Sequence, residues 1–171
     1  YIKQNSTELE EQKELQRLFK NDKAEGFVGR ESDLAAIQSY ISGDKGKFNP
    51  NQPLVIYGPS GMGKSALIAK AVEQTECAHI NVIYRFVGSV SGLSNSVDVI
   101  KSIIYDFNPD VDSKELELRT VKDEQGVESQ EVLQEYFYRL RRYFDRIKKD
   151  TIIFIDAVDQ FSNKDLLIND V

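Results

Sequence analysis

A short stretch of the chain combines glycines, a lysine and a serine in a spacing that suits phosphate chemistry. It reads Gly58-Pro59-Ser60-Gly61-Met62-Gly63-Lys64-Ser65, the pattern G-x-x-x-x-G-K-S. Backbone N–H groups of a tight loop can converge on an anion only where no Cβ blocks the approach, so glycines are needed. The Lys64 ammonium would reach the outer phosphates of a nucleoside triphosphate, and the Ser65 hydroxyl would bind Mg²⁺. The stretch therefore predicts a phosphate-binding loop, or P-loop.

The neighbouring sequence predicts the strand and the helix that such a loop requires. The run from Pro53 to Tyr57 is largely apolar without alternation, as expected for a short strand covered on both faces. The run from Ala66 to Val72 favours a helix. The start of that helix would direct free N–H groups and the positive end of its dipole at the phosphates. A glycine turn that meets a helix by accident is the alternative, and both flanks count against it.

A second stretch could supply an acidic group for the metal. It reads Thr151-Ile152-Ile153-Phe154-Ile155-Asp156-Ala157-Val158-Asp159-Gln160, an apolar strand that ends in an aspartate. Ligands of parallel sheets gather at the carboxyl ends of the strands, so Asp156 could hold the Mg²⁺ bound by Ser65. This is the Walker B pattern. Asp159 could polarise an attacking water, or it could simply cap the turn that follows.

The remaining sequence predicts the elements that must position these residues. Apolar residues at helical spacing, capping signals and β-branched runs mark the elements and the loops between them. The acidic segment 110–129 is predicted as a surface excursion. Aromatic residues between 130 and 148 fit a helix core better than a ligand box. The predicted elements are helices over 6–20, from 34 to 41, from 95 or 96 to 107 and over 130–148, and a strand over 80–87.

Composition limits the classes of function. The chain has 171 residues, 40% of them hydrophobic and 29% charged, which fits one ordinary globular domain. A formal net charge of −6 argues against a surface built to bind nucleic acid. The sequence contains neither a membrane-spanning stretch nor a secretory signal pattern. Cys77 is the only cysteine, which fits a reducing compartment, and we expect a cytoplasmic protein. Its pairing with His79 as zinc ligands is disfavoured.

Three separated motifs together carry a family resemblance. The segment Phe27-Val28-Gly29-Arg30-Glu31 stands before a predicted helix, and the P-loop and the Walker B strand follow. With the stretch 84–89, this order resembles the STAND class of signal-transduction NTPases, close to the NACHT-like branch. The resemblance covers residues 27–161, which is most of the chain. It implies ATP or ADP as the ligand, with Mg²⁺.

The resemblance also implies roles for individual residues. Val28, Gly29 and Arg30 would lie along the adenine, and the loop from Pro59 through Ala66 would hold the phosphates. Lys64, Asp156 and Asp159 would form the catalytic set, with Ser65 and Asp156 at the metal. Gln160 stands where many relatives carry Glu, so hydrolysis is expected to be slow.

The implied fold is a three-layer α/β/α P-loop NTPase with a parallel sheet. In related folds a later strand inserts between the P-loop strand and the Walker B strand, and here the chain ends before it. We therefore expect a fragment of a larger protein, with 1–26 as a helical connector and 27–171 as an incomplete NTPase domain. Effector and repeat domains would lie outside this chain. The ATP-bound form would assemble into a homo-oligomer, in signalling or defence.

Three other functions stay open at this point. A AAA+ ATPase of the replication-initiator kind also carries a Gly-Arg-Glu start, but it would act on DNA, and the acidic composition counts against it. Salt-dependent DNA binding would identify it. A nucleotide-binding scaffold would hold nucleotide without releasing phosphate. A small-molecule kinase would need an acceptor pocket and a lid, and the sequence signals neither.

Overall fold

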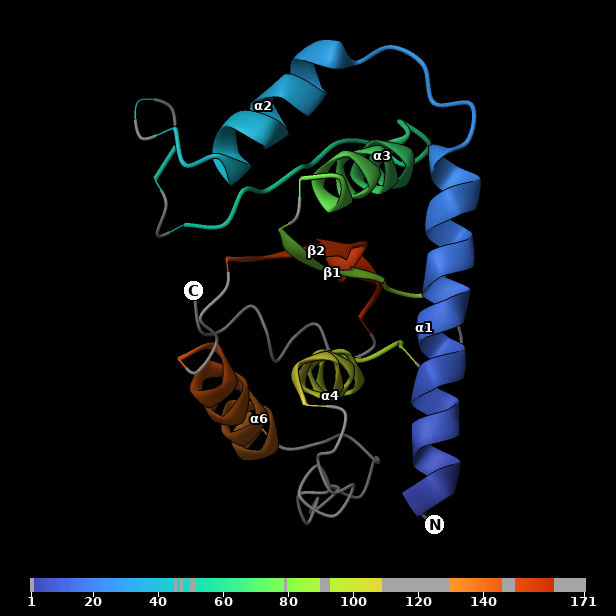
Figure 1. Ribbon diagram of the computed structural model, residues 1–171, viewed down its shortest axis with the longest axis vertical. Coiled ribbons are helices and arrows are strands. Elements are labelled where there is room, and N and C mark those ends of the chain that lie inside the picture. The colour runs from blue at the N-terminus through green and yellow to red at the C-terminus, as the bar shows by residue number, and fades with distance from the viewer. Residues whose placement is uncertain are drawn as a thin grey trace.

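The computed structural model describes residues 2–44, 46, 48–49, 52–78, 80–89, 93–108, 130–145 and 150–161. Predictions that concern the acidic segment 110–129 or His79 lie outside these residues. The described elements follow one another along the chain as Figure 1 shows. They are the helices α1 (Ile2–Ala24), α2 (Glu31–Ile41), α3 (Lys64–Glu76), α4 (Ser96–Phe107) and α6 (Gln130–Phe144), the strands β1 (Asn81–Phe86) and β2 (Thr151–Asp156), and the short 3₁₀ turn Val158–Gln160.

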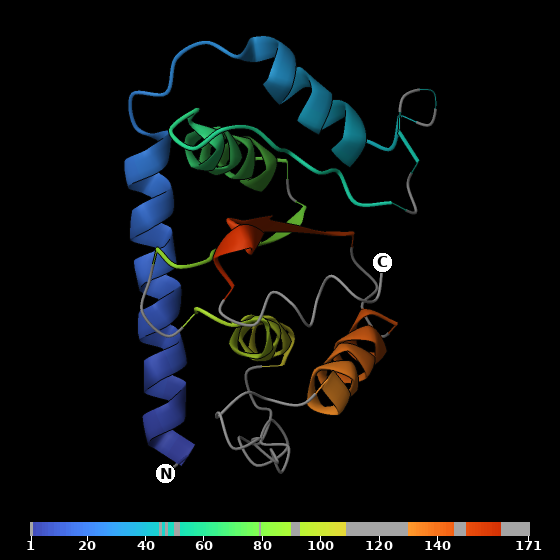
Figure 2. The same cartoon turned by 180° about the vertical axis from the view of Figure 1, so that it is seen from behind.

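The two described strands form a parallel pair at the centre of the molecule. Their register runs from Asn81 opposite Thr151 to Phe86 opposite Asp156. The helices α2 and α3 lie on one side of the pair, and α4 and α6 lie on the other (Figures 1 and 2). This arrangement confirms the predicted α/β fold with helices on both faces of a parallel sheet. None of the helices that the structure describes is both long and apolar enough to cross a bilayer.

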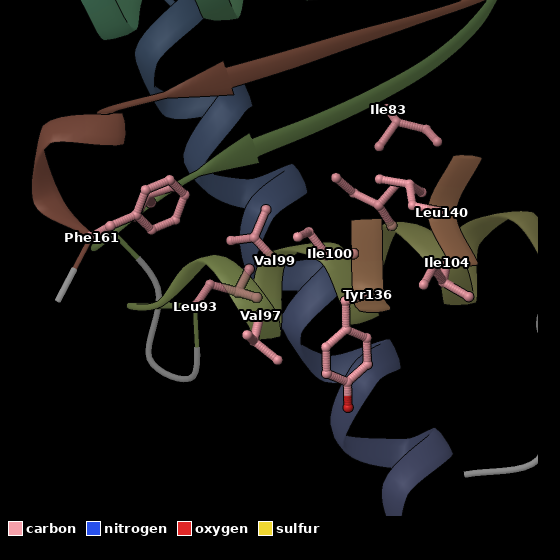
Figure 3. Packing of buried hydrophobic residues seen from close by; sticks show 11 residues of the cluster. Ile83, Leu93, Val97, Val99, Ile100, Ile104, Tyr136, Leu140 and Phe161 are labelled. Carbon is pink, nitrogen blue, oxygen red and sulfur yellow. The ribbon is translucent and has the colours of Figure 1, made fainter. Parts of the chain in front are cut away.

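Buried apolar side chains fix both helical layers against the strands. Figure 3 shows the cluster that joins β1, α4 and α6, in which Tyr136 of α6 and Ile104 of α4 are both fully buried. On the opposite face, Ile68 and Val72 of α3 pack with Phe86 of β1. Burial of this kind contributes about 25 cal/mol per Å² of apolar surface, so the helices are held mainly by packing.

The N-terminal helix α1 is longer than the predicted 6–20 and packs beside α3 and the outer edge of β1 (Figure 1). The ring of Phe19 lies 5.0 Å from the ring of Phe86. The Lys20 ammonium lies 2.6 Å from the Glu76 carboxylate at the end of α3. The role of this helix as a connector to another domain stays a prediction.

The predicted strand from Pro53 to Tyr57 is not formed. The segment lacks helix or strand pairing in the structure, and Val55 and Tyr57 are 69% and 91% exposed. Sheet bonds require a neighbouring strand about 4.8 Å away, and a cavity instead lies between this segment and β2. The apolar run is therefore present, but among the described residues it has no strand partner.

Helix α2 begins three residues earlier than predicted, at Glu31. The residue before it, Arg30, is the N-cap of the helix and adopts a left-handed conformation with φ 59°. At the other end, Gly43 follows the C-cap Ser42 and has a positive φ of 73°, the conformation in which glycine commonly ends a helix.

Candidate functional site

The P-loop lies between the extended segment 53–57 and the start of α3. Gly61 and Gly63 have φ values of 80° and 73°, a region that L-residues rarely adopt, and Gly63 is the N-cap of α3. A Cβ added at Gly58, Gly61 or Gly63 would meet no other heavy atom within 4 Å. The space in front of the loop is therefore open, and the glycines leave the backbone N–H groups accessible from it.

Lys64 is the first residue of α3, and its ammonium folds back over the loop. The Nζ atom donates hydrogen bonds to the carbonyl oxygens of Gly58, at 2.8 Å, and of Pro59, at 3.0 Å. An ammonium has three N–H donors, so one is left for a further acceptor even in this arrangement. The cation is held at the loop, where phosphate oxygens would compete with the two carbonyls for it.

A cavity of about 750 Å³ joins the two predicted motifs. Ser65 at the start of α3 lines it from one side, and Asp156 at the end of β2 lines it from the other. The volume falls within the usual range for small-molecule sites, about 300–1,000 Å³. From the predicted site the cavity wall includes Ser60, Gly61, Gly63, Lys64, Ser65, Ala66, Asp156 and Asp159.

The end of β2 and the turn after it determine where Asp156 and Asp159 lie. Asp156 is only 6% exposed, and its backbone carbonyl accepts a hydrogen bond from the N–H of Val87 at 3.2 Å. Ala157 has a φ of 60°, which a residue with a Cβ adopts at a cost of about 1–2 kcal/mol. The chain then enters the 3₁₀ turn that carries Asp159, whose side chain is exposed. Asp156 is thus held by the sheet, and Asp159 stands free of it.

The segment predicted to lie along the adenine is joined to the P-loop by one side chain. Arg30 donates from Nη1 to the backbone carbonyl of Met62, at 3.1 Å, and from Nε to the Asp33 carboxylate, at 2.8 Å. Val28 is 88% exposed, and none of Val28, Gly29 and Arg30 is among the cavity-lining residues. The structure therefore brings Arg30 to the loop, while Val28 and Gly29 stand outside the cavity.

Sequence reasoning missed the part of the cavity wall that α2 provides. Ile37, Tyr40 and Ile41 line the cavity beside the P-loop. Their helical spacing marked them only as one apolar face of a helix, and no feature of that spacing distinguishes a core contact from a cavity wall. The hydroxyl of Tyr40 donates to the carbonyl of Gln52 at 2.9 Å, which fixes the entry to segment 53–57.

Comparison with known proteins agrees with this geometry. Residues 27–170 match a family described as an ATPase domain predominantly from Archaea. The chain is also similar to the human protein named NACHT domain- and WD repeat-containing protein 1, with 34% identity over 82 residues. That similarity covers 46% of this chain and 5% of the human protein, so the chain spans a small part of that relative. No solved structure matches. Because the family match includes the P-loop, both strands and the turn that carries Asp159, this chain belongs to that ATPase-domain family and is a P-loop NTPase.

Proposed function

We propose that this chain is the ATP- and ADP-binding module of a STAND-type signalling ATPase and acts as a nucleotide-dependent switch. Nucleotide binding follows from its membership of an ATPase-domain family. The observation that carries the proposal is that Lys64, Ser65 and Asp156, from two distant parts of the sequence, meet at one cavity. A cation, a hydroxyl and a carboxylate around an open glycine loop suit a Mg²⁺–nucleotide complex.

Each residue has a definite task in this proposal. The N–H groups of the loop from Pro59 through Ala66, together with the Lys64 ammonium, bind the phosphates. Ser65 and Asp156 hold Mg²⁺, which usually takes only one or two protein ligands and completes its shell with phosphates and water. When bound, the metal offsets the negative charge of the phosphate oxygens. The open space at the glycines and the spare donor of Lys64 fit such a ligand.

Slow hydrolysis and a conformational readout complete the proposal. Asp159 lines the cavity and has an exposed side chain, so it can accept a hydrogen bond from a water molecule. Its neighbour Gln160 carries an amide, which can orient water but cannot take its proton. Nucleotide state would therefore persist and shift the population between resting and active forms. Effector and repeat domains outside this chain, and a homo-oligomer of the ATP-bound form, would convert that shift into a signal.

The test compares Lys64→Ala with Lys70→Ala, a lysine that lies on the same helix outside the cavity wall. ATP affinity is measured by calorimetry, and the nucleotide that remains bound after purification is released by denaturation and quantified. Loss of a charge-assisted contact to phosphate costs about 1.5–3 kcal/mol, so Lys64→Ala should bind ATP about 10- to 100-fold more weakly. Lys70→Ala should bind as the wild type does.

Circular dichroism of the Lys64→Ala variant provides the control for its fold. The described side-chain bonds of Lys64 go only to two loop carbonyls, so its removal should leave the circular dichroism spectrum unchanged. If Lys64→Ala unfolded the chain, Lys64 would be a structural residue and the site assignment would be wrong. Phosphate release from wild-type protein with ATP separates a slow ATPase from a scaffold that does not turn over.

A further inference from the structure

A buried glutamine of α1 forms hydrogen bonds to the outer edge of β1. Gln16 is only 2% exposed, although charged residues surround it in the sequence. Its Oε1 accepts a hydrogen bond from the N–H of Phe86 at 2.7 Å, and its Nε2 donates to the carbonyl of Phe86 at 3.2 Å. One side-chain amide thus bonds both backbone groups of one strand residue, and the Phe86 carbonyl also accepts a hydrogen bond from the Ser89 hydroxyl at 2.6 Å.

This pairing replaces the contact that a further strand would make. A strand at the edge of a sheet has outward N–H and C=O groups that require partners, and an amide side chain supplies a donor and an acceptor at once. The next residue, Val87, faces the other way, because its N–H donates to the carbonyl of Asp156 at 3.2 Å. The end of β1 is therefore bonded on one side to α1 and on the other to the residue proposed to hold Mg²⁺.

The register makes this connection short. Phe86 stands directly opposite Asp156 in the parallel pair, so only one strand separates Gln16 from the aspartate backbone. Helix α1, which carries Gln16, also forms ion pairs with one helix on each face of the strand pair. Lys20 forms an ion pair with Glu76 of α3 at 2.6 Å, and Lys13 forms one with Asp106 of α4 at 2.7 Å.

We propose that Gln16 is a positioning residue for the metal site, which holds Asp156 in place through Phe86 and Val87. The inference rests on the proposed function, because it gives Asp156 the role of a Mg²⁺ ligand. If Gln16 only bonded the backbone groups at the edge of β1, its replacement would change the stability of the fold but not the effect of Mg²⁺ on nucleotide binding. A glutamine that positions Asp156 must also affect how strongly Mg²⁺ supports nucleotide binding.

The experiment measures ATP affinity by calorimetry, once with Mg²⁺ and once with EDTA. Gln16→Met keeps the length of the side chain and its helix preference but removes both hydrogen bonds. Gln12→Met is the matched control, since Gln12 lies one turn earlier on the same helix and is less buried. Affinities are compared at a temperature where circular dichroism shows each variant folded. If Gln16→Met does not fold, Gln16→Leu, a good helix former that likewise removes both hydrogen bonds, takes its place.

The expected result is specific to the metal. The Gln16 variant should bind ATP about tenfold more weakly than wild type in Mg²⁺ and within twofold of it in EDTA, while Gln12→Met should change neither value. Equal losses with and without Mg²⁺ would show a general loosening of the domain, and unchanged affinity in a folded Gln16 variant would show no coupling. Either result overturns the inference. Wild-type protein that binds no ATP at all would instead remove the proposed function, and this inference with it.

Discussion

Replacement of Arg30 allows the backbone and the side chain of one residue to be tested separately. Its φ of 59° lies in the left-handed region, which costs a residue with a Cβ about 1–2 kcal/mol. Glycine removes that cost but has more freedom to lose on folding, which leaves a net gain of about 0.5–1 kcal/mol. Arg30→Gly therefore relieves the backbone, whereas Arg30→Ala retains the strain. Both variants remove the guanidinium.

The side chain makes two interactions that both variants lose. The Arg30 side chain is 36% exposed, so solvent weakens its ion pair with Asp33, which contributes only about 0.2–1 kcal/mol to the free energy of unfolding. The bond to the Met62 carbonyl contributes about 0.5–1.5 kcal/mol. The free energy of unfolding should consequently fall by about 1–2 kcal/mol in Arg30→Ala. In Arg30→Gly it should stay within about 1 kcal/mol of the wild-type value.

Nucleotide affinity should behave differently from stability. Both variants free the Met62 carbonyl, and with it the middle of the P-loop, so both should bind ATP about three- to tenfold more weakly. Urea denaturation measures the stabilities, and calorimetry with Mg²⁺ and ATP measures the affinities. The reasoning would be refuted if Arg30→Gly were destabilised as much as Arg30→Ala. It would also be refuted if both variants bound ATP as tightly as the wild type, since the loop would then not depend on this contact.

Two further predictions concern the turn after β2 and a tyrosine of β1. Ala157→Gly should raise the free energy of unfolding by about 0.5–1 kcal/mol, because the φ of 60° at this residue suits glycine. The control Ala36→Gly, within α2, should lower the free energy of unfolding by about 1 kcal/mol. If urea denaturation showed a change of the same sign for both variants, the backbone of Ala157 would not be strained. Burial and the nearby Glu76 carboxylate raise the pKa of Tyr84 to about 12. The folded state therefore keeps the phenol proton that the unfolded state loses, so stability is complete below pH 10 and declines between pH 10 and 12. Tyr84→Phe should reduce this decline by about 1 kcal/mol, after allowance for the partial exposure of the ring, and parallel profiles of the two proteins in urea would contradict the assignment.

Local signals were enough to predict several elements. The predicted strand 151–156 and the predicted start of α4 agree with the structure. A run of apolar, largely β-branched residues marks the strand, and a capping residue marks the start of the helix, so each signal lies within a few residues of the element. Asn95, for example, accepts a hydrogen bond from the N–H of Asp98 at 2.8 Å, which is the usual chemistry of a helix cap. The P-loop likewise carries its backbone requirements in its glycines. Such features depend on neighbours in the sequence, so the sequence alone can indicate them.

Features that depend on distant partners were not predictable. The run from Pro53 to Tyr57 has the composition of a strand, but a strand also needs a neighbour, and no local pattern states whether one is present. The burial of Gln16 was equally hidden, because a glutamine among charged residues is most often exposed. The contact of Arg30 with Met62 joins two motifs that the sequence presents as separate. In each case the missing information was which parts of the chain meet.

The packing of α1 has a consequence for where this domain is considered to begin. The family match starts at residue 27, yet Gln16 and Phe19 lie against β1 as closely as many residues inside the match. A chain shortened to that boundary would keep every motif by which the family is recognised. It would also leave the N–H of Phe86 without its Gln16 partner at the strand edge, while the Phe86 carbonyl would keep its bond from the Ser89 hydroxyl, and an unpaired strand edge favours pairing with other molecules. The limits of the family match and the limits of the packed structure therefore differ here by one helix.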